Sequence, residues 1–284
     1  MSRDQSLSSP QFKAPPGACD THMHIVGPED RFPFAPGNEG RFPEYPLAAY
    51  DKIAEQLGIE RSVVVMTHHY KTDHRLLLDT LDRMGNRARG VAVVDTTVSL
   101  QQLKQLTEKG VRGASFYMFR SGIFSWDMVE AIARHIADCA WHAQVQLDGL
   151  TLPDYFDFLR KLPCDLVIDH IGKFQQAVKP DHPSFQALLK LIEGGRCYVK
   201  LSAPYESSTD KPPFLADSGT LAKELIRQAP ERMLWGSNWP HLGAAAGAKP
   251  DDAELLACLA IWAGDEQVYR KILSDNPATL YGFS

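Results

Sequence analysis

The chain has 284 residues, of which 44% are hydrophobic and 23% charged, with a formal net charge of -5 and a pI of about 6.1. This composition allows a large core and does not favour a nucleic acid or an anionic membrane as a partner. Residues 255–263 form the longest uncharged apolar stretch, which is too short to span a bilayer. The first 17 residues lack the apolar segment of a signal peptide, and the five cysteines are scattered. We therefore expect a soluble cytoplasmic protein with free thiols.

Short apolar or β-branched runs recur along the chain, and each is followed by a segment whose apolar residues have helical spacing. The predicted strands cover residues 18–24, 61–66, 89–94, 111–117, 143–148, 166–170, 197–201 and 233–238. The predicted helices cover residues 47–57, 73–84, 100–106, 126–140, 152–162, 185–192, 221–229 and 252–262. One further short helix is predicted over residues 266–273, before Asn276-Pro277.

Eight strands that alternate with helices are typical of a closed parallel barrel. The alternative is an open doubly wound sheet, which usually carries a Gly-rich phosphate loop after its first strand. The segment Thr21-His22-Met23-His24 is not such a loop. We therefore predict an α/β fold with a single TIM-like (β/α)8 barrel domain over residues 18–284, preceded by an N-terminal arm of residues 1–17.

Polar side chains at the C-terminal ends of barrel strands usually point into the active site. His22 and His24 end the first predicted strand and share a face because they are two residues apart. His170 ends the sixth strand and Asn238 ends the eighth, so we expect these four residues to carry the chemistry. Further candidates at or near strand ends, expected to bind substrate, are His69, Ser115, Arg120, Gln146, Lys173, Lys200 and His241.

Each of these signals is weak when it is taken alone. A single His-x-His is more often structural than functional, and the same holds for His69 in its loop. Asp169 is interpreted as a buried structural carboxylate. Lys200, inside an apolar run, is as compatible with a carboxylate partner as with the pocket. The hypothesis of a site rests on the expected meeting of strands one, six and eight at one barrel mouth.

Several segments together resemble the amidohydrolase superfamily, and within it the amidohydrolase 2 group. They are Asp20-Thr21-His22-Met23-His24, Ile168-Asp169-His170-Ile171-Gly172, Trp235-Gly236-Ser237-Asn238-Trp239-Pro240-His241 and Asn276-Pro277. The resemblance covers nearly the whole chain and implies a distorted (β/α)8 barrel. It also implies a site built from the His pair, the strand-six His and a strand-eight Asp that serves as general base or metal ligand.

The sequence departs from this pattern at Asn238, which takes the position of the Asp. An amide does not accept a proton at neutral pH, and the loss of a general base typically lowers a rate by about 10²–10⁴-fold. Asn is also a poor neutral ligand for a divalent ion. The branch resembled is implied to work on lactones without a metal. We therefore expect no cofactor, with a divalent metal such as zinc as the less favoured alternative.

A lactone site without a base for water has a second possible chemistry, in which a hydroxyl of the substrate attacks the carbonyl. Intramolecular nucleophiles reach effective molarities of about 10⁵–10⁸ M. The resemblance implies small anionic sugar-acid substrates, so we expect isomerisation of D-galactaro-1,5-lactone to the 1,4-lactone. On this hypothesis His22, His24 and His170 donate hydrogen bonds to the carbonyl and Asn238 orients the reacting hydroxyl.

Lys173, Arg120 and Lys200 are expected to supply a cationic lining for the anionic substrate, and Gln146 a further polar contact. Three alternatives stay open. The first is a metal-independent lactone hydrolase in which His69 or His241 activates water. The second is a metal-dependent decarboxylase or hydrolase, and the third is a binding protein without activity. The sequence predicts no oligomeric state.

Overall fold

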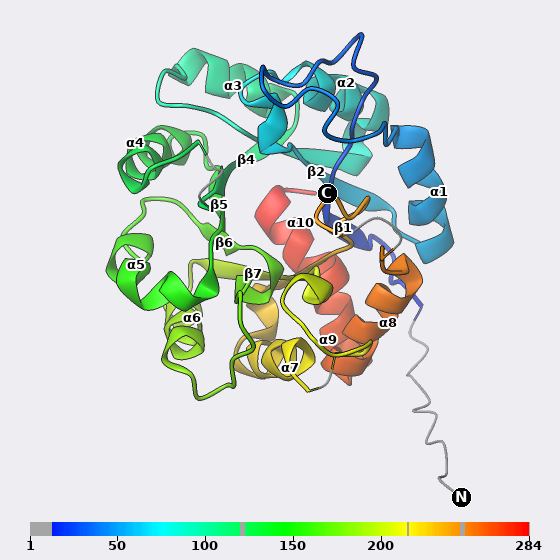
Figure 1. The fold of residues 1–284 in the computed structure, drawn as a ribbon, viewed down its shortest axis with the longest axis vertical. Coiled ribbons are helices and arrows are strands. Elements are labelled where there is room, and N and C mark those ends of the chain that lie inside the picture. Colours follow the sequence, from blue (N-terminus) through cyan, green and yellow to red (C-terminus); the bar gives the residue numbers. More distant parts are fainter. Residues whose placement is uncertain (1–12, 120–122, 215, 245–247, 284) are drawn as a thin grey trace, which may run out of the picture.

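The computed structural model describes residues 13–119, 123–214, 216–244 and 248–283. The strands are β1 (Cys19–Met23), β2 (Arg61–Val65), β3 (Ala88–Ala92), β4 (Val111–Tyr117), β5 (His142–Gln146), β6 (Leu166–Ile168), β7 (Cys197–Ser202) and β8 (Met233–Gly236). They are parallel and follow one another in sequence order around a nearly closed barrel, with helices on the outside (Figure 1). The predicted single-domain (β/α)8 barrel is confirmed.

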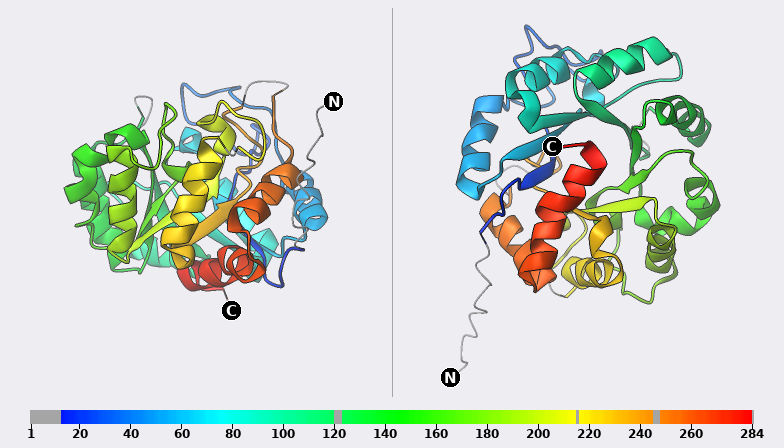
Figure 2. Two further views of the ribbon diagram at one scale, coloured as in Figure 1. Left: turned by 90° about the horizontal axis from the view of Figure 1, so that it is seen from below. Right: turned by 180° about the vertical axis from the view of Figure 1, so that it is seen from behind.

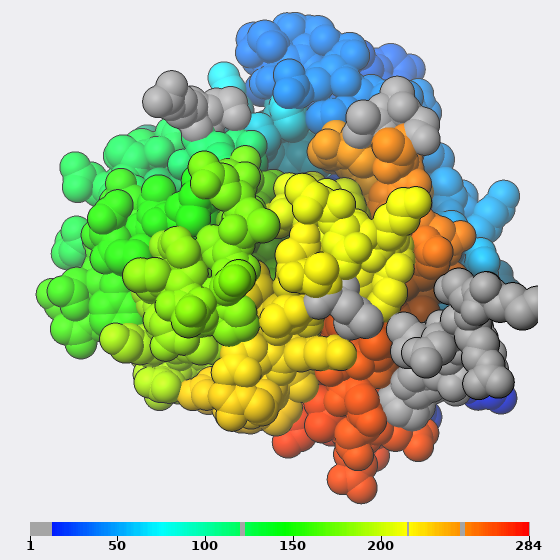
Figure 3. Space-filling model, turned by 60° about the horizontal axis from the view of Figure 1, so that its bottom comes forward, coloured from blue at the N-terminus to red at the C-terminus, as the bar shows by residue number. Residues whose placement is uncertain are grey.

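The outer layer consists of one helix after each strand. These are α1 (Leu47–Leu57), α2 (Arg75–Met84), α3 (Leu100–Glu108), α4 (Trp126–Ala137), α5 (Leu152–Leu159), α6 (Pro183–Glu193), α7 (Ser218–Gln228) and α8 (Asp252–Ala263). On the face in Figure 3, the green, yellow and red regions lie beside one another in their order along the sequence. Among the described residues, no helix is long and apolar enough to cross a membrane.

Local sequence signals explain these elements. The strands are buried on both faces, which favours apolar runs such as Val63-Val64-Val65 in β2. Helix α3 begins with a capping box formed by Ser99 and Gln102. Helix α8 is capped by Asp251, whose side chain accepts from two backbone amides at its N-terminus.

The C-terminal region is more helical than predicted. Helix α9 (Glu266–Arg270) continues through a π-helical segment (Lys271–Asp275) into α10 (Asn276–Tyr281). The prediction of a helix over 266–273 that ends before Asn276-Pro277 was therefore wrong at its end, because proline fits the first turn of a helix. The red helices lie across one end of the barrel in the two views of Figure 2. The opposite end stays open for a site.

Strands β5, β6 and β8 end two residues earlier than predicted, because the backbone turns sharply after each one. After β6 the chain enters a 3₁₀ turn (His170–Gly172), where His170 and Ile171 have φ angles of 55° and 57°. After β5, Asp148 accepts a hydrogen bond from the backbone amide of Leu150 and begins another such turn. The side chains of these turns are therefore aimed by irregular backbone rather than by strand alternation.

The barrel closes between its first and last strands. Seven strand pairs, from β1–β2 to β7–β8, form parallel ladders within the described residues, with register shifts in β1–β2 and β3–β4. Strand β8 also lies against β1. The hydroxyl of Thr21 donates to the backbone carbonyl of Trp235 at 2.8 Å, and the backbone amide of Asn238 donates to the backbone carbonyl of His22 at 2.8 Å. A Cβ added at Gly236 would lie 2.5 Å from the Cβ of His22, so this close approach requires glycine.

Candidate active site

A cavity of about 200 Å³ opens at the C-terminal ends of the strands. Its size suits a ligand of one small ring. Eight residues predicted from the sequence line it: His22, His24, His69, Ser115, Gln146, His170, Lys173 and Asn238. The other lining residues were not predicted as site residues, and they include Arg41, His68, Tyr117, Asp169 and Glu206.

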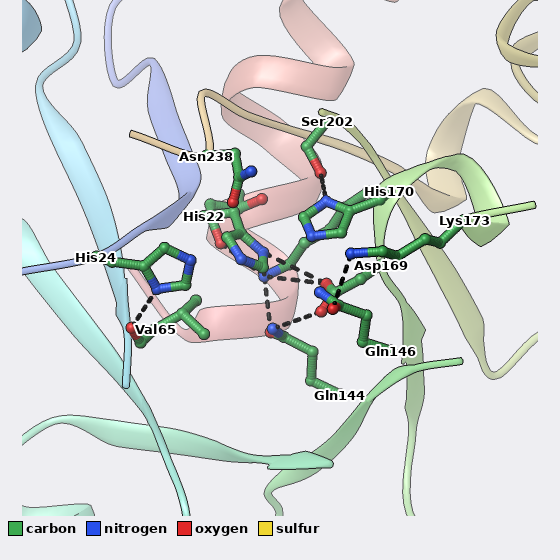
Figure 4. Close-up of polar contacts among 12 residues, drawn as sticks. His22, His24, Val65, Gln144, Gln146, Asp169, His170, Lys173, Ser202 and Asn238 are labelled. Atoms are coloured by element: carbon green, nitrogen blue, oxygen red, sulfur yellow. Dashed lines mark hydrogen bonds and ion pairs between the residues drawn. The ribbon is translucent and has the colours of Figure 1, made fainter. Parts of the chain in front are cut away.

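Three histidines form the centre of the site. The ring of His22 lies between those of His24 and His170, with centroid distances of 4.9 and 4.8 Å (Figure 4). All three are deeply placed in the barrel, and burial is the main reason why the pKa of each imidazole is lowered. The three rings are therefore neutral near pH 7, so each one offers both a donor and an acceptor nitrogen.

The partners of His24 fix its tautomer. Its Nδ1 lies 2.7 Å from the carbonyl oxygen of Val65, and a carbonyl can only accept. The neutral ring therefore carries its proton on Nδ1 and has a lone pair on Nε2. This contradicts the expectation that all three histidines donate to the lactone carbonyl, because neutral His24 has an acceptor left to offer.

His22 has the opposite arrangement, because a buried ammonium lies behind it. Lys200 Nζ donates to His22 Nδ1 at 3.3 Å and to the carbonyl of Thr21 and the Oε1 of Gln144, each at 2.7 Å. With Nδ1 accepting, the neutral His22 ring carries its proton on Nε2. His22 can therefore donate a hydrogen bond to a bound carbonyl.

Asp169 completes the charge balance behind His22. Its Oδ2 accepts from Gln144 Nε2 at 3.1 Å, and its Oδ1 lies 3.4 Å from His22 Nδ1 and 3.9 Å from Lys200 Nζ. Burial lowers the pKa of Lys200 to about 8 although this carboxylate opposes the shift. Asp169 was interpreted as purely structural, whereas it pairs with Lys200 and also lines the cavity.

His170 is oriented from β7. Its Nδ1 lies 2.8 Å from the hydroxyl of Ser202, the last residue of that strand. A serine hydroxyl donates or accepts, so this contact aims the ring while leaving both tautomers open.

Asn238 lies directly beside this group (Figure 4). Its Nδ2 donates to the hydroxyl of Tyr205 at 2.9 Å and to Oε1 of Glu206 at 3.3 Å. A carboxylate only accepts, so Glu206 fixes which end of the amide carries the nitrogen. The atom of Asn238 that faces Glu206 is therefore Nδ2, which donates hydrogen bonds and does not accept a proton.

The carboxylate of Asp20 joins the two chain segments that carry His22 and Asn238. It accepts from the backbone amides of His22 and Ser237, each at 3.0 Å, and from the hydroxyls of Ser237 at 2.5 Å and Tyr50 at 3.1 Å. Burial raises the pKa of Asp20 to about 6, and these hydrogen bonds limit the rise. Asp20 thus acts as a clamp between the end of β1 and the end of β8.

Glu206 forms a second charged pair at the mouth. Lys173 Nζ lies 2.5 Å from Glu206 Oε2 and donates to Gln146 Oε1 at 3.1 Å. Both charged side chains are mostly buried, with 14% and 13% of their surface exposed. Lys173 was expected to hold a substrate carboxylate, but its charge is already matched by Glu206.

Two expectations about substrate binding were wrong. Lys200 has no exposed surface and lies behind His22, so it does not line the cavity. His241 is also buried, where its Nδ1 contacts the Tyr205 hydroxyl at 2.9 Å and its Nε2 lies 3.2 Å from Asp252. Arg120 lies outside the described residues.

The backbone is unusual where β6, β7 and β8 end. His170, Lys173, Ala203 and Asn238 have φ angles of 55°, 45°, 46° and 63°. For residues other than glycine this conformation costs about 1–3 kcal/mol each, and it gathers at functional sites because it aims side chains that a strand would not. The turns after these strands bring the side chains of four lining residues to the cavity: His170, Lys173, Glu206 and Asn238.

A metal ion was the less favoured alternative. Among the described residues, His22, Asp169 and His170 form the one group of three whose ligand atoms lie within 4.8 Å of one another. The ammonium of Lys200 stands beside two of these ligands, and Asn238 contributes no negative charge. A buried cation already balances the carboxylate that a divalent ion would need, so these residues fit such an ion poorly.

Comparisons with known proteins show to which family this barrel belongs. The sequence profile described as amidohydrolase matches residues 19–283. The chain belongs to the amidohydrolase family. One curated relative of this amidohydrolase is the 2-pyrone-4,6-dicarboxylate hydrolase of Comamonas testosteroni, 34% identical over 284 residues that cover 96% of this chain and 93% of the relative.

Another relative is the D-galactarolactone isomerase of Agrobacterium fabrum, which is 32% identical over 286 residues. The matched region covers 99% of this chain and 97% of the relative. A 4-sulfomuconolactone hydrolase of Hydrogenophaga intermedia is 30% identical over 96% of this chain and 91% of its own. The apo crystal structure of an Agrobacterium tumefaciens protein matches this amidohydrolase with a TM-score of 0.89 and 32% identity, covering 96% of this chain and 98% of that one.

Proposed function

We propose that this amidohydrolase acts on a lactone, and that it converts D-galactaro-1,5-lactone to the 1,4-lactone by attack of a substrate hydroxyl. The observation that carries the proposal is the amide of Asn238, which presents N–H groups to Tyr205 and Glu206 where the resemblance implies a carboxylate. The relatives named for lactone isomerisation and hydrolysis support the substrate class.

The charges of the cavity favour a substrate with one carboxylate. Lys173 is paired with Glu206, and Lys200 is paired with Asp169 behind the site. Arg41 is the one cation without such a partner among the described residues that line the cavity. The 1,5-lactone of galactaric acid has one carboxylate, whereas a pyrone dicarboxylate would bring two. We therefore assign Arg41 to the substrate carboxylate.

The reaction needs the carbonyl to be polarised and one hydroxyl to be held near it. The Nε2–H of His22 donates to the carbonyl oxygen and stabilises the negative charge that develops there. His170 supplies a second donor in the tautomer that has its proton on Nε2. The O4 hydroxyl of the lactone forms the new bond to C1 as the bond from C1 to O5 breaks.

We further propose that the site works without a metal, because the Lys200 ammonium stands beside His22 and Asp169. Metal analysis of the purified protein, before and after dialysis against a chelator, tests this. We expect unchanged turnover and less than stoichiometric metal. One tightly bound zinc per chain, with loss of activity on its removal, would contradict the proposal.

A lactone hydrolase is the second candidate, and the observation that favours it is the Nε2 lone pair of His24, whose ring also contacts the side chain of Asn238. That nitrogen is an acceptor for a water proton inside the cavity. His241 does not reach the cavity, and burial is the main cause that lowers the pKa of His69 to about 3, so neither is a strong base for water.

Product analysis in ¹⁸O-labelled water separates the two candidates. The 1,5-lactone is incubated with the enzyme, and the products are followed by carbon NMR and mass spectrometry, with His22→Ala protein as the background control. Ring exchange gives the 1,4-lactone without label. An open-chain acid that carries one labelled oxygen per turnover would refute isomerisation and establish hydrolysis.

A further inference from the structure

Glu206 is a carboxylate in the cavity whose place in the chain gives little sign of a function. It ends the 3₁₀ turn Pro204–Glu206, which follows β7. Ala203 precedes this turn with a φ angle of 46° and redirects the chain back towards the barrel mouth. As a result the carboxylate lines the cavity instead of pointing into solvent.

Two donors and one glycine fix the position of this carboxylate. Oε1 accepts from Asn238 Nδ2 at 3.3 Å, and Oε2 accepts from Lys173 Nζ at 2.5 Å. On a third side a Cβ added at Gly243 would lie 2.7 Å from Oε1, so the absence of a side chain there makes space for Glu206. A carboxylate has about four lone-pair sites, which leaves acceptor capacity for a substrate hydroxyl.

Ring exchange in a lactone moves one proton and needs no net proton acceptor. The attacking O4 loses its proton as the O4–C1 bond forms, and O5 gains one as the C1–O5 bond breaks. Because O4 and O5 are on neighbouring carbons, one carboxylate can serve both atoms in turn. Among the described residues, Asp169 is the other carboxylate that lines the cavity, and it is paired with Lys200 and Gln144.

We propose that Glu206 is the catalytic proton carrier of this site, taking the proton from the attacking hydroxyl and returning it to the leaving ring oxygen. This inference rests on the proposed isomerisation. Asn238 has a defined part in it, since its N–H group orients the carboxylate where an aspartate would repel it. Lys173 is the counter-charge of the carboxylate, and Asn238 Nδ2 also donates to the Tyr205 hydroxyl.

The test uses Glu206→Gln, which keeps the shape of the side chain and removes its ability to carry a proton. We expect kcat for ring exchange to fall by about 10²–10⁴-fold, with the KM changed by less than about threefold. Glu206→Asp should recover part of the rate.

A merely structural role for Glu206, as the counter-charge of Lys173, predicts a different result. In that case the double variant Glu206→Gln/Lys173→Met, which removes both charges, should regain most of the lost activity. On our inference it stays at least as slow as Glu206→Gln. Recovery in the double variant, or a Glu206→Gln rate within about threefold of the wild type, would overturn the inference. Unchanged thermal unfolding of each variant shows that the fold is retained.

The two proposals fail in different ways. If wild-type enzyme yields a labelled open-chain acid, isomerisation is wrong, and the same variants then ask whether Glu206 activates water. If wild-type enzyme exchanges the ring and Glu206→Gln keeps its rate, isomerisation holds and the role of Glu206 is wrong.

Discussion

Replacing Asn238 with Asp asks whether the amide at this position prevents attack by water. In the wild type, Nδ2 donates to Glu206 Oε1 at 3.3 Å. In Asn238→Asp an oxygen takes the place of this nitrogen, so two carboxylates face each other at a similar distance. An attractive contact becomes a repulsive one.

The size of the repulsion follows from the geometry. At 3.3 Å and an effective dielectric constant of about 20, two unit charges repel by about 5 kcal/mol, which corresponds to roughly 3.7 pKa units. Lys173, 2.5 Å from the other oxygen of Glu206, offsets part of this. In this variant the repulsion should therefore raise the upper apparent pKa of the carboxylate pair. Below that pKa the pair holds one proton, and above it both groups are ionised.

The assay is label incorporation from ¹⁸O water, measured together with ring exchange between pH 5 and 9. Asn238→Asp should gain hydrolysis as the pH rises through the raised pKa. The double variant Asn238→Asp/Glu206→Gln exchanges the positions of carboxylate and amide, so it should hydrolyse across the whole range and lose ring exchange. If neither variant incorporates label above the wild-type level, the amide does not control the choice of nucleophile, and the reasoning is refuted.

Three further predictions concern the surroundings of this pair. Arg41→Ala should raise the KM about 10–100-fold with little change in kcat, because it removes a charge-assisted hydrogen bond to the substrate carboxylate. The control is Arg87→Ala, which removes an exposed arginine outside the cavity. A KM of Arg41→Ala no higher than that of the control would contradict this. Gly243→Ala should lower kcat roughly tenfold or more, because the added Cβ displaces Glu206. Thermal unfolding of the variant is the control for folding. A kcat of Gly243→Ala equal to that of the wild type would contradict the placement of Glu206. In the folded protein, burial lowers the pKa of Lys200 from its usual 10.5 to about 8. Between these values the unfolded chain holds the proton more tightly, so the unfolding free energy of the wild type should rise with pH in this window. Lys200→Met should lose that rise in denaturant titrations at pH 7.5 and 10, and the same pH dependence in both proteins would show that Lys200 is not the group responsible.

The fold could be predicted because it repeats one simple unit. Each unit joins a buried strand to an amphipathic helix, and eight units close a barrel. His22, His24, His170 and Asn238 could be grouped because the ends of parallel barrel strands meet at one mouth. The cavity contains all four.

The environment of Lys200 could not be predicted. It lies in β7, which is buried on both faces, so alternation does not tell which face holds the ammonium. Its partners Thr21 and Gln144 come from β1 and β5, and such contacts depend on barrel closure rather than on local sequence.

Glu206 and Arg41 were missed for a different reason. Both reach the cavity from irregular segments, where strand or helix periodicity gives no direction for the side chain. The one available signal for Glu206 was the Tyr205-Glu206 pair, which begins three residues after Ser202 at the end of a strand. Arg41 lies in a loop rich in proline and glycine, and its position depends on how that loop folds over the mouth.

The clamp formed by Asp20 joins residues that are far apart in the chain, since Asp20 and Ser237 are separated by 217 positions. The same contacts complete the barrel and bring His22 next to Asn238. A folding intermediate in which β1 to β7 are paired but β8 is still loose would have nearly all its helices and no working site. Catalytic activity recovered during refolding therefore times the closure of the ring, whereas circular dichroism times the earlier formation of its helices.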